Sequence, residues 1–406
     1  MSTFSKAVIL GLILFSVVSV FLSIPSEEYY RTGADEGTYY RMASIVSRQG
    51  VWGIEDIGRE YLKSEQAKLQ PSPLRVGHIL MTALWFNIFP QTYVSLAHYS
   101  FTCFIVFIAI SFLFARKHFG EDVAYFFALL ISSSPLMMAM GRRALSDMPG
   151  NLWYGLVIWL FLDYLRDKSN VTYGLLLVVF SIAILARESA LMVWPFLVVM
   201  FLVSKYLYKN DLPVSSLVGI VVVPAFMVFT VYAVLFGGIV ETFRLLSSVF
   251  MLHGDSAAQT SKFSIVFCSG PWFRYLIDFI VLSPWTLLLF LAFVGHKLIS
   301  RDLMWNEVYF AGYFAWIFFV HTCVVYFKDV RLIINLDMVI SLFSVLCLME
   351  LFRQKKSENR LLLMMGSVTV IFFINYSNFL EVFYGKDVYD PISYALLAAK
   401  KIVPLF

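Results

Sequence analysis

Residues 213–236 read PVSSLVGIVVVPAFMVFTVYAVLF and contain no charged side chain. A helix of this length is about 36 Å long at ~1.5 Å per residue, enough to cross the roughly 30 Å hydrocarbon core of a bilayer. Similar apolar runs recur along almost the whole chain, and short charged clusters separate them. The pattern therefore predicts an integral membrane protein with many spans.

The composition agrees with a membrane environment. Of the 406 residues, 60% are hydrophobic and only 14% are charged, so no sizeable soluble domain fits between the apolar runs. The net charge of +4 is small and dispersed, which argues against a nucleic-acid partner. The four cysteines are too few for a disulfide scaffold and lack zinc-ligand spacing.

The apolar runs predict an all-α polytopic membrane protein with about eleven transmembrane helices. A long first exoplasmic loop, 25–94, is expected to carry interfacial helices, and 237–274 is expected to form a second exoplasmic loop. We expect all these parts to form one transmembrane domain over 1–406. The predicted spans are 7–24, 95–115, 123–140, 149–165, 171–186, 190–204, 213–236, 275–295, 305–327, 332–352 and 361–376.

Basic clusters after alternate spans predict the orientation. Short loops rich in Lys and Arg stay in the cytoplasm, so the opposite ends of these spans should face outside. The stretch 74–89 is apolar but short, and a full crossing there would invert the pattern, so we expect a re-entrant or surface helix. The clusters lie at 116–118, 166–168, 205–209, 296–301 and 353–356.

The first loop also contains an amphipathic stretch. Tyr39, Met42, Ala43 and Val46 share one helical face, whereas Arg41, Ser44 and Arg48 share another. This pattern is typical of a helix lying in the membrane interface. The tyrosines at 29, 30, 39 and 40 could stack on a sugar. At the other end of the chain, 395–402 is expected to lie on the membrane.

Ionisable residues gather on the predicted outer side, each near the end of a span. Charges next to hydrocarbon cost on the order of a few kcal/mol each, so such a cluster usually lines a wet cavity or pairs internally. Acids and cations in one cavity would suit a lipid that carries phosphate. The residues are Asp35, Glu36, Arg142, Arg143, Asp147, Arg187, Glu188, Lys328, Asp329 and Arg331.

The order of these motifs resembles the GT-C superfamily of membrane glycosyltransferases, in particular bacterial relatives of the protein O-mannosyltransferases and lipid A aminoarabinose transferases. The resemblance covers most of the chain to about residue 350. Its motifs are Asp-Glu at 35–36, Pro-Ser-Pro at 71–73, Arg-x-x-x-x-Asp-Met-Pro at 142–149 and Lys-x-x-Arg at 328–331. The chain departs from the family pattern at 69–70, where Leu-Gln replaces a frequent lysine, and after Arg331, where Leu-Ile-Ile replaces a proline-containing helix start.

The resemblance implies an inverting glycosyltransferase of the hexosyltransferase type in a bacterial plasma membrane, with its active site on the outer face. It would take a sugar from a polyprenyl-phosphate donor and pass it to a glycan, lipid or protein acceptor. Asp35 matches the family's general base, and the acids Glu36, Asp147 and Glu188 are candidates for a supporting role. A divalent cation, Mg²⁺ or Mn²⁺, held by Asp35, Asp147 or Glu188 with the donor phosphate is left open.

Five cations are candidates for binding the donor phosphate, because arginine offers a bidentate fork and lysine a point charge. They are Arg75, Arg142, Arg187, Lys328 and Arg331. The adjacent residues Arg187 and Glu188 point in different directions from a helix, which argues against a mutual salt bridge.

Simpler interpretations compete with these roles. Asp35 and Asp147 could be helix N-caps, and Arg142 and Arg143 could extend to lipid headgroups. Lys328 and Arg331, three apart on one helical face, could clamp a phosphate or merely anchor a span. A transporter or flippase of lipid-linked sugars would also need charged cavity residues, but uncharged span centres and the lack of a sequence repeat favour the enzyme. A structural or assembly subunit is a third alternative.

Overall fold

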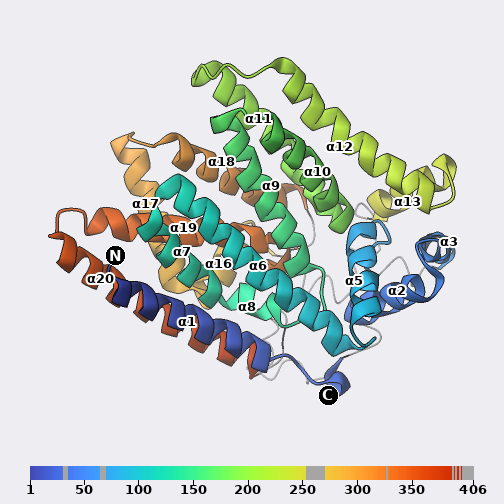
Figure 1. The fold of residues 1–406 in the computed structure, drawn as a ribbon, viewed down its shortest axis with the longest axis horizontal. Helices are drawn as coiled ribbons and strands as arrows, with labels where there is room; N and C mark the ends of the chain where they lie inside the picture. The colour runs from blue at the N-terminus through green and yellow to red at the C-terminus, as the bar shows by residue number, and fades with distance from the viewer. Residues whose placement is uncertain are drawn as a thin grey trace. The chain divides into compact units, whose positions relative to one another are not determined.

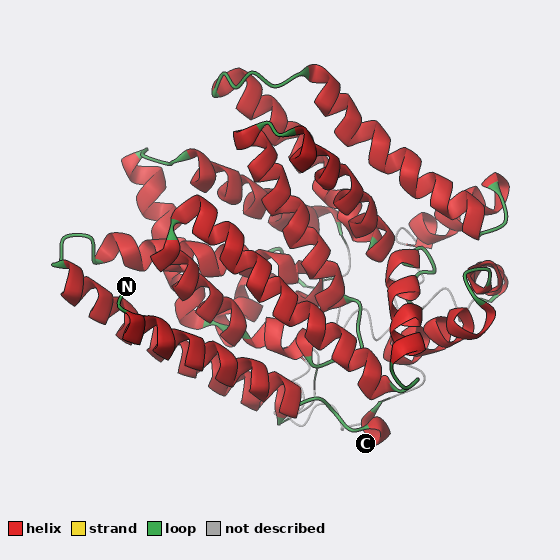
Figure 2. Ribbon diagram, in the orientation of Figure 1, coloured by secondary structure: helices red, strands yellow, loops and turns green. Residues whose placement is uncertain are grey.

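Every regular element in the described part of the chain is a helix (Figure 2). The structure is a computed structural model and describes residues 1–30, 35–64, 70–252, 270–325, 328–385, 388, 391–392 and 395. The chain forms two compact units. Unit 1 comprises Met1–Ser23, Phe104–Arg142 and Phe263–Phe406, and unit 2 comprises Ile24–Cys103 and Arg143–Lys262. The predicted all-helical class is confirmed; the expected membrane segment 395–402 lies outside the described residues except for Ala395.

Unit 2 holds the predicted first loop and four of the predicted spans. In the described residues the predicted first loop contains three α-helices, of which the last is short and apolar, and the long helices follow it. In chain order the elements are η1 (Glu27–Tyr29), α2 (Asp35–Gln49), α3 (Gly53–Lys63), α5 (Val76–Ile88), the start of α6 (Tyr93–Phe119), α9 (Asp147–Asp167), α10 (Asn170–Ala186), η2 (Glu188–Met192), α11 (Val193–Leu202), η3 (Val203–Leu207), α12 (Val214–Leu235) and α13 (Ile239–Leu252) (Figure 1).

Two tyrosine contacts define the opposite ends of the long helices in unit 2. At one end the rings of Tyr164 and Tyr173 lie 5.0 Å apart across the α9–α10 turn, and the Tyr173 hydroxyl donates to Ser216 O at 3.0 Å. At the other end of α12 the Tyr232 hydroxyl donates to Leu74 O at 2.8 Å. The basic turn 166–168 therefore lies at the end of unit 2 opposite to the residues that precede α5.

The short helix α5 packs closely against α10. Its 13 residues span about 20 Å at ~1.5 Å per residue, too little to cross a bilayer, as the prediction of a re-entrant or surface helix requires. Contact is tight at Gly77, where an added Cβ would lie 2.9 Å from both Ala186 N and Leu185 C. Backbone rather than a flexible side chain fills that space, so only glycine allows this approach.

Unit 1 holds the first helix and the C-terminal helices. In chain order its elements are α1 (Thr3–Leu22), the remainder of α6, α7 (Glu121–Ser133), α8 (Pro135–Gly141), α16 (Arg274–Leu282), α17 (Pro284–Ser300), α18 (Trp305–Phe319), η4 (Val320–Val324), η5 (Val330–Ile333), α19 (Ile334–Leu351), α20 (Ser357–Asn378) and η6 (Phe379–Tyr384). At one end of the unit, Lys6 pairs with Glu121 at 3.0 Å and Asn306 donates to His118 O at 3.3 Å.

Two predicted spans of unit 1 are broken. The predicted span 123–140 coincides with a helix pair rather than one straight helix, because α7 and α8 are bent by 62°. Ser134 caps α8 by accepting the Met137 N–H, and Pro135 occupies the first helical turn, where its missing N–H does no harm. The predicted span 275–295 likewise divides at Ser283, because Pro284 starts α17. At the first break the Ser134 hydroxyl donates to the buried Asp337 carboxylate of α19.

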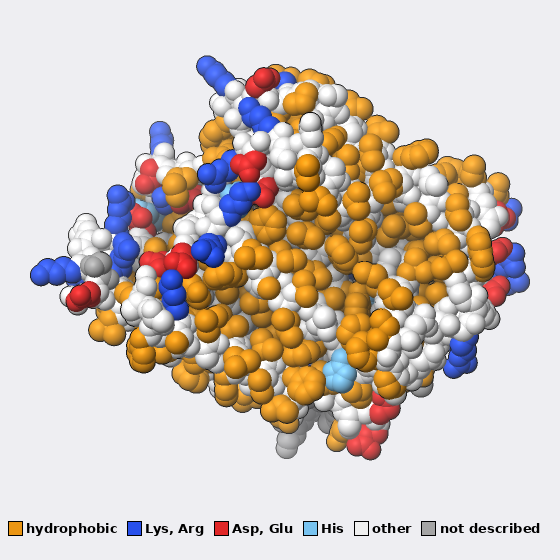
Figure 3. All heavy atoms as spheres, in the orientation of Figure 1, with side chains coloured by type: hydrophobic (Ala, Val, Ile, Leu, Met, Phe, Trp, Pro, Cys, Tyr) orange, Lys and Arg blue, Asp and Glu red, His pale blue; other side chains and the backbone are white. Residues whose placement is uncertain are grey.

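All eleven predicted spans coincide with helices or helix pairs, but the count of eleven crossings is not confirmed. Among the described residues, seven helices are long and apolar enough to cross a membrane, and eight if the bent pair α7–α8 counts as one span. The helices α10 and α17 have 17 residues each, slightly fewer than the ~20 that a perpendicular span needs. The visible sides of α1 and α12 carry mainly apolar side chains, whereas charges gather over the turns (Figure 3).

The close approach at Gly77 gives a test of the packing. Substitution Gly77→Ala should lower the free energy of unfolding by roughly 1–3 kcal/mol, because a methyl group there overlaps the α10 backbone. The matched control is Gly174→Ala on α10, where a Cβ meets nothing within 4 Å. Thermal unfolding in detergent measures both; equal midpoints for the two variants would contradict the packing described.

Candidate active site

Three ion pairs gather at one end of unit 2, where α2, α5 and α9 begin and α10 ends. The first joins Glu36 in the first turn of α2 to Arg143. Arg143 donates from Nε to Oε1 at 2.8 Å and from Nη2 to Oε2 at 2.9 Å, and the Ala144 N–H donates to Oε1 at 3.3 Å. Both side chains are buried, so the two charges neutralise each other out of water. The pair fixes the start of α2 to the segment before α9.

The second pair joins the end of α10 to the start of α9. The Arg187 guanidinium lies 3.1 Å from Asp147 Oδ1, and both side chains are buried. Gly150 in the next part of α9 leaves room for this arginine, since a Cβ there would lie 3.0 Å from Arg187 Cδ. The cap position of α9 is Ser146, so the interpretation of Asp147 as the N-cap is wrong. Its carboxylate in the first turn still suits the positive end of the helix dipole.

The third pair, Arg75 with Glu188, is the most exposed of the three. Arg75 donates from Nε to Oε2 at 2.9 Å and from Nη2 to Oε1 at 3.0 Å, with 19% and 13% of the two side chains exposed. Its Nη1 donates to the Tyr39 hydroxyl and, at 3.1 Å, to Ser146 Oγ. Arg187 and Glu188 thus have different partners, as their adjacent positions predict. One guanidinium connects α2, the start of α5, the start of α9 and η2.

The charges around Arg75 set the protonation of their neighbours. Burial lowers the pKa of Arg75, but Glu188, Tyr39 and Asp147 together outweigh this effect, and the pKa of Arg75 lies well above its ordinary value. Burial also raises the pKa of Tyr39 to about 12, against the opposing charge of Arg75. At neutral pH the arginine is therefore charged and the phenol neutral, so Tyr39 can donate as well as accept a hydrogen bond.

The proposed base, Asp35, is the first described residue of α2 and is partly exposed. Its charge is among those that raise the pKa of Tyr39, which lies one helical turn further along. Asp35 and Tyr39 therefore share one side of α2, the side from which Tyr39 contacts Arg75. The sequence indicated Tyr39 only as a buried or sugar-stacking residue and did not indicate Ser146; the spacing of four residues from Asp35 to Tyr39 was the available signal.

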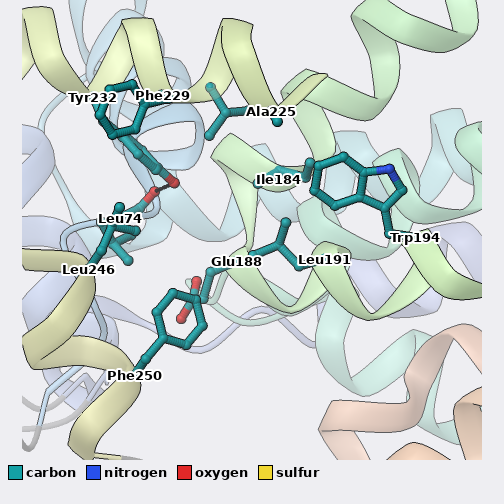
Figure 4. A pocket seen from close by; sticks show the side chains of 11 residues that line it. Leu74, Ile184, Glu188, Leu191, Trp194, Ala225, Phe229, Tyr232, Leu246 and Phe250 are labelled. Carbon is teal, nitrogen blue, oxygen red and sulfur yellow. Dashed lines mark hydrogen bonds between the residues drawn. The ribbon is translucent and has the colours of Figure 1, made fainter. Parts of the chain in front are cut away.

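An apolar cavity of about 160 Å³ adjoins Glu188. Its walls come from the segment before α5, the end of α10, η2, α11, α12 and α13, and among the described lining residues Glu188 has the single carboxylate (Figure 4). Leu74, Trp194, Phe229, Leu246 and Phe250 supply apolar surface, and Tyr232 directs its hydroxyl to Leu74 O. The arrangement combines an apolar chamber with a guanidinium–carboxylate pair at its border.

The remaining predicted residues lie in unit 1. Arg142 is buried and donates from Nε to Ser23 O at 2.7 Å and from Nη1 to Phe383 O at 2.8 Å. Arg142 and Arg143 are both buried, so the interpretation that they extend to lipid headgroups is wrong. Arg331 in η5 pairs with Asp329 at 2.9 Å.

Lys328 lies before η5, not on a common helix with Arg331, so the expected shared helical face is also wrong. The predicted contacts of Arg142, Lys328 and Arg331 with phosphate stay predictions.

The acids of the site offer little support for a metal ion of their own. No group of three His, Cys, Asp or Glu side chains able to hold a metal occurs in the described part of the chain. Asp147 and Glu188, two of the three acids considered for a cation, each neutralise an arginine. A divalent ion at Asp35 would therefore take most of its ligands from donor phosphate and water.

The buried pair Glu36–Arg143 gives a test of how the site is held. Substitution Glu36→Gln should lower the free energy of unfolding by about 3–5 kcal/mol, because it leaves the Arg143 charge buried and unpaired. The control is Glu241→Gln, whose partner Arg244 is exposed and whose loss should cost less than about 1 kcal/mol. Thermal unfolding in detergent compares them; a similar small loss in both would contradict a buried, paired Glu36.

Comparison with known proteins identifies the fold. The family model for dolichyl-phosphate-mannose-protein mannosyltransferase matches residues 75–232, a range that begins at Arg75 and includes Arg143, Asp147, Arg187 and Glu188. No curated protein sequence matches the chain.

Solved structures extend the likeness to the whole chain. ArnT from Cupriavidus metallidurans, bound to undecaprenyl phosphate, superposes with a TM-score of 0.65 at 15% identity, over 99% of this chain and 82% of ArnT. The oligosaccharyltransferase of Archaeoglobus fulgidus, tethered to an acceptor peptide, gives a TM-score of 0.62 at 12% identity, over 93% of this chain and 55% of that enzyme. Both proteins are GT-C glycosyltransferases. The chain therefore has the fold of the GT-C superfamily, as the order of its motifs predicts.

Proposed function

We propose that the protein is a membrane glycosyltransferase that moves a sugar from a polyprenyl-phosphate donor to an acceptor hydroxyl at the exoplasmic face. The observation that carries the proposal is the pairing of Arg75 with Glu188 beside an apolar cavity, at the end of unit 2 where α2 begins with Asp35. A polyprenyl-phosphate donor matches this site, because its isoprenoid chain is apolar like the cavity and its charged phosphate can meet the guanidinium. The GT-C fold and the undecaprenyl phosphate bound to ArnT support this substrate class.

Arg75 is the cation best suited to meet the donor phosphate. It is the most exposed arginine of the three pairs, and its guanidinium has five N–H donors, of which four are used by Glu188, Tyr39 and Ser146. The fifth N–H, on Nη2, can reach an arriving phosphate. A phosphate there would compete with Glu188 for the guanidinium, so part of its binding energy would replace an existing pair rather than add a new one.

The chemistry needs one base and a stabilised leaving group. Asp35 takes the proton of the acceptor hydroxyl while that oxygen attacks the anomeric carbon, and the bond from that carbon to the phosphate oxygen breaks. The polyprenyl phosphate leaves with the electron pair of that bond, and Arg75 stabilises its negative charge. Attack from the side opposite to the leaving group inverts the anomeric configuration. Asp35 ends as the carboxylic acid and returns its proton to water.

The other acids and cations have supporting places in this scheme. Glu36 and Asp147 hold the start of α2 and the start of α9 through Arg143 and Arg187, and Glu188 orients Arg75. These ion pairs hold the helix ends that position the proposed base, Asp35, and the proposed phosphate-binding residue, Arg75. Catalysis by positioning requires such fixed placement. Arg142, Arg187, Lys328 and Arg331 remain candidates for further phosphate contacts.

Removal of the base gives the first test of the function. Asp35→Asn keeps the size of the side chain but cannot accept the proton, so transfer from a radiolabelled polyprenyl-phosphate sugar in membranes should fall by about 10²–10⁴-fold. Asp56→Asn, on the exposed side of α3 in the same loop, should retain activity. Product analysis for a new glycosidic bond distinguishes a transferase from a flippase. Unchanged turnover of Asp35→Asn would exclude its role as base.

Replacement of Arg75 tests the donor site. Arg75→Lys keeps the charge but loses the fork, so the KM for the donor and the Kd for undecaprenyl phosphate should each rise about tenfold or more. Arg59→Lys, an exposed arginine on α3, is the control, and thermal unfolding confirms that the variant is folded. A folded Arg75→Lys protein with unaltered donor affinity would show that the phosphate binds elsewhere.

A further inference from the structure

Tyr232 on α12 touches two different parts of the proposed donor site. Its ring lines the apolar cavity beside Glu188, and its hydroxyl donates to Leu74 O at 2.8 Å (Figure 4). Leu74 directly precedes Arg75, the proposed ligand of the donor phosphate. One side chain therefore contacts both the place proposed for the isoprenoid chain and the backbone that carries the phosphate ligand.

Local hydrogen bonds shape the turn before α5 but do not fix its place in unit 2. The Ser72 hydroxyl accepts the Leu74 N–H at 3.1 Å, and the Arg75 N–H donates to Ser72 O at 3.4 Å. Both partners of each bond belong to the same turn, so these bonds would move with it. The bond from Tyr232 comes from a residue 158 positions further along the chain. This long-range bond holds the turn against α12.

The end of α12 that carries Tyr232 is itself closely packed. Phe236 lies one turn later, with its ring centroid 5.7 Å from that of Tyr232. The helix α3 approaches this end at Gly58, where an added Cβ would lie 2.8 Å from Phe236 Cδ1 and 3.1 Å from Leu245 Cδ1 of α13. Tyr232 and Leu74 are both buried, so the hydroxyl and the carbonyl meet out of water, where an unpaired carbonyl is unfavourable.

The cavity beside Tyr232 is small. Its volume is about 160 Å³, and an apolar cavity of roughly this size holds one benzene molecule, so about one isoprene unit fits there. That unit is the one next to the phosphate, because Leu74 is part of the cavity wall and the proposed phosphate ligand follows it directly. Ala225 of α12 and Phe250 of α13 also line the cavity and are exposed, so the rest of the chain can continue toward lipid.

The hydroxyl of Tyr232 can be removed without changing the cavity wall, because phenylalanine has the same ring. Its loss would leave Leu74 O without this donor and let the turn before α5 take other positions. One buried hydrogen bond is worth about a three- to tenfold change in an equilibrium constant. If the phosphate binds only when Arg75 has the observed position, the apparent Kd for the donor rises by up to the same factor.

We propose that Tyr232 is a positioning residue for the donor, whose hydroxyl sets Arg75 for the phosphate through Leu74 O and whose ring meets the first isoprene unit. This inference rests on the proposed function, because it assigns a further residue to the same donor site. Tyr232 acts on the phosphate through Arg75 and takes no part in the proton transfer to Asp35. A polyprenol, which has the chain but no phosphate, uses only the ring.

Tyr232→Phe tests this role, since it keeps the ring and removes the hydroxyl. The full chain in lipid nanodiscs is titrated with undecaprenyl phosphate and with undecaprenol. Tyr232→Phe should raise the Kd for undecaprenyl phosphate about three- to tenfold and leave the Kd for undecaprenol unchanged, which also shows that the variant is folded. The control is Tyr173→Phe, which removes a similar hydrogen bond, to Ser216 O at the other end of unit 2, and should alter neither Kd.

A double-variant cycle tests whether Tyr232 acts through Arg75. In an Arg75→Lys background, Tyr232→Phe should raise the Kd for undecaprenyl phosphate by less than about twofold, because a flexible lysine depends less on where its backbone lies. Independent effects of the two substitutions, equal rises for both ligands, or an unaltered Kd in Tyr232→Phe would overturn the inference.

The same titrations separate this inference from the proposed function. A wild type that binds undecaprenyl phosphate no better than undecaprenol refutes the proposed donor site and the role of Tyr232 with it. A wild type that prefers undecaprenyl phosphate, with Arg75→Lys weakened and Tyr232→Phe unaffected, refutes only the role of Tyr232.

Discussion

The site of unit 2 depends on one guanidinium that is largely removed from water. Arg75 has to satisfy its donors inside the protein, and it does so with groups from η2, α2 and the segment before α9. Since an unpaired charge in such a place is strongly unfavourable, these three segments must meet wherever Arg75 is placed. The buried pair Glu36–Arg143 likewise requires α2 to meet the segment before α9, and the buried pair Asp147–Arg187 requires α9 to meet the end of α10. Charge pairing, rather than apolar packing alone, defines this end of the unit.

The positions of the charged helix ends in the candidate site could largely be predicted, because they depend on the local order of charged and apolar residues. Charged residues next to apolar runs mark helix ends, and the order of Asp-Glu, Pro-Ser-Pro, Arg-x-x-x-x-Asp-Met-Pro and Lys-x-x-Arg indicated the GT-C fold. The adjacent positions of Arg187 and Glu188 also predicted separate partners, which the structure confirms. The breaks at Ser134-Pro135 and Ser283-Pro284 were missed, although proline after a possible cap favours a new helix start.

The partner of each charge could not be predicted. Whether Glu36 meets Arg143 or Arg75 depends on the rotation of α2 and on the path of the chain between helices, neither of which a hydropathy pattern contains. The burial of Ser44 could not be predicted either. A small polar residue on an amphipathic helix is expected to be exposed, yet Ser44 is only 6% exposed. Tyr39 reads as core because it is apolar over most of its surface, while its hydroxyl contacts Arg75.

The contacts at the first turns of α2 have a consequence for variation in this protein and its relatives. Glu36 pairs with Arg143, and the Tyr39 hydroxyl accepts from Arg75. An inserted or deleted residue between them would turn the rest of the helix by about 100°, so the two side chains could no longer both reach their partners. Length changes are better tolerated after Gln49, where Gly50, with a φ of +70°, already ends the helix.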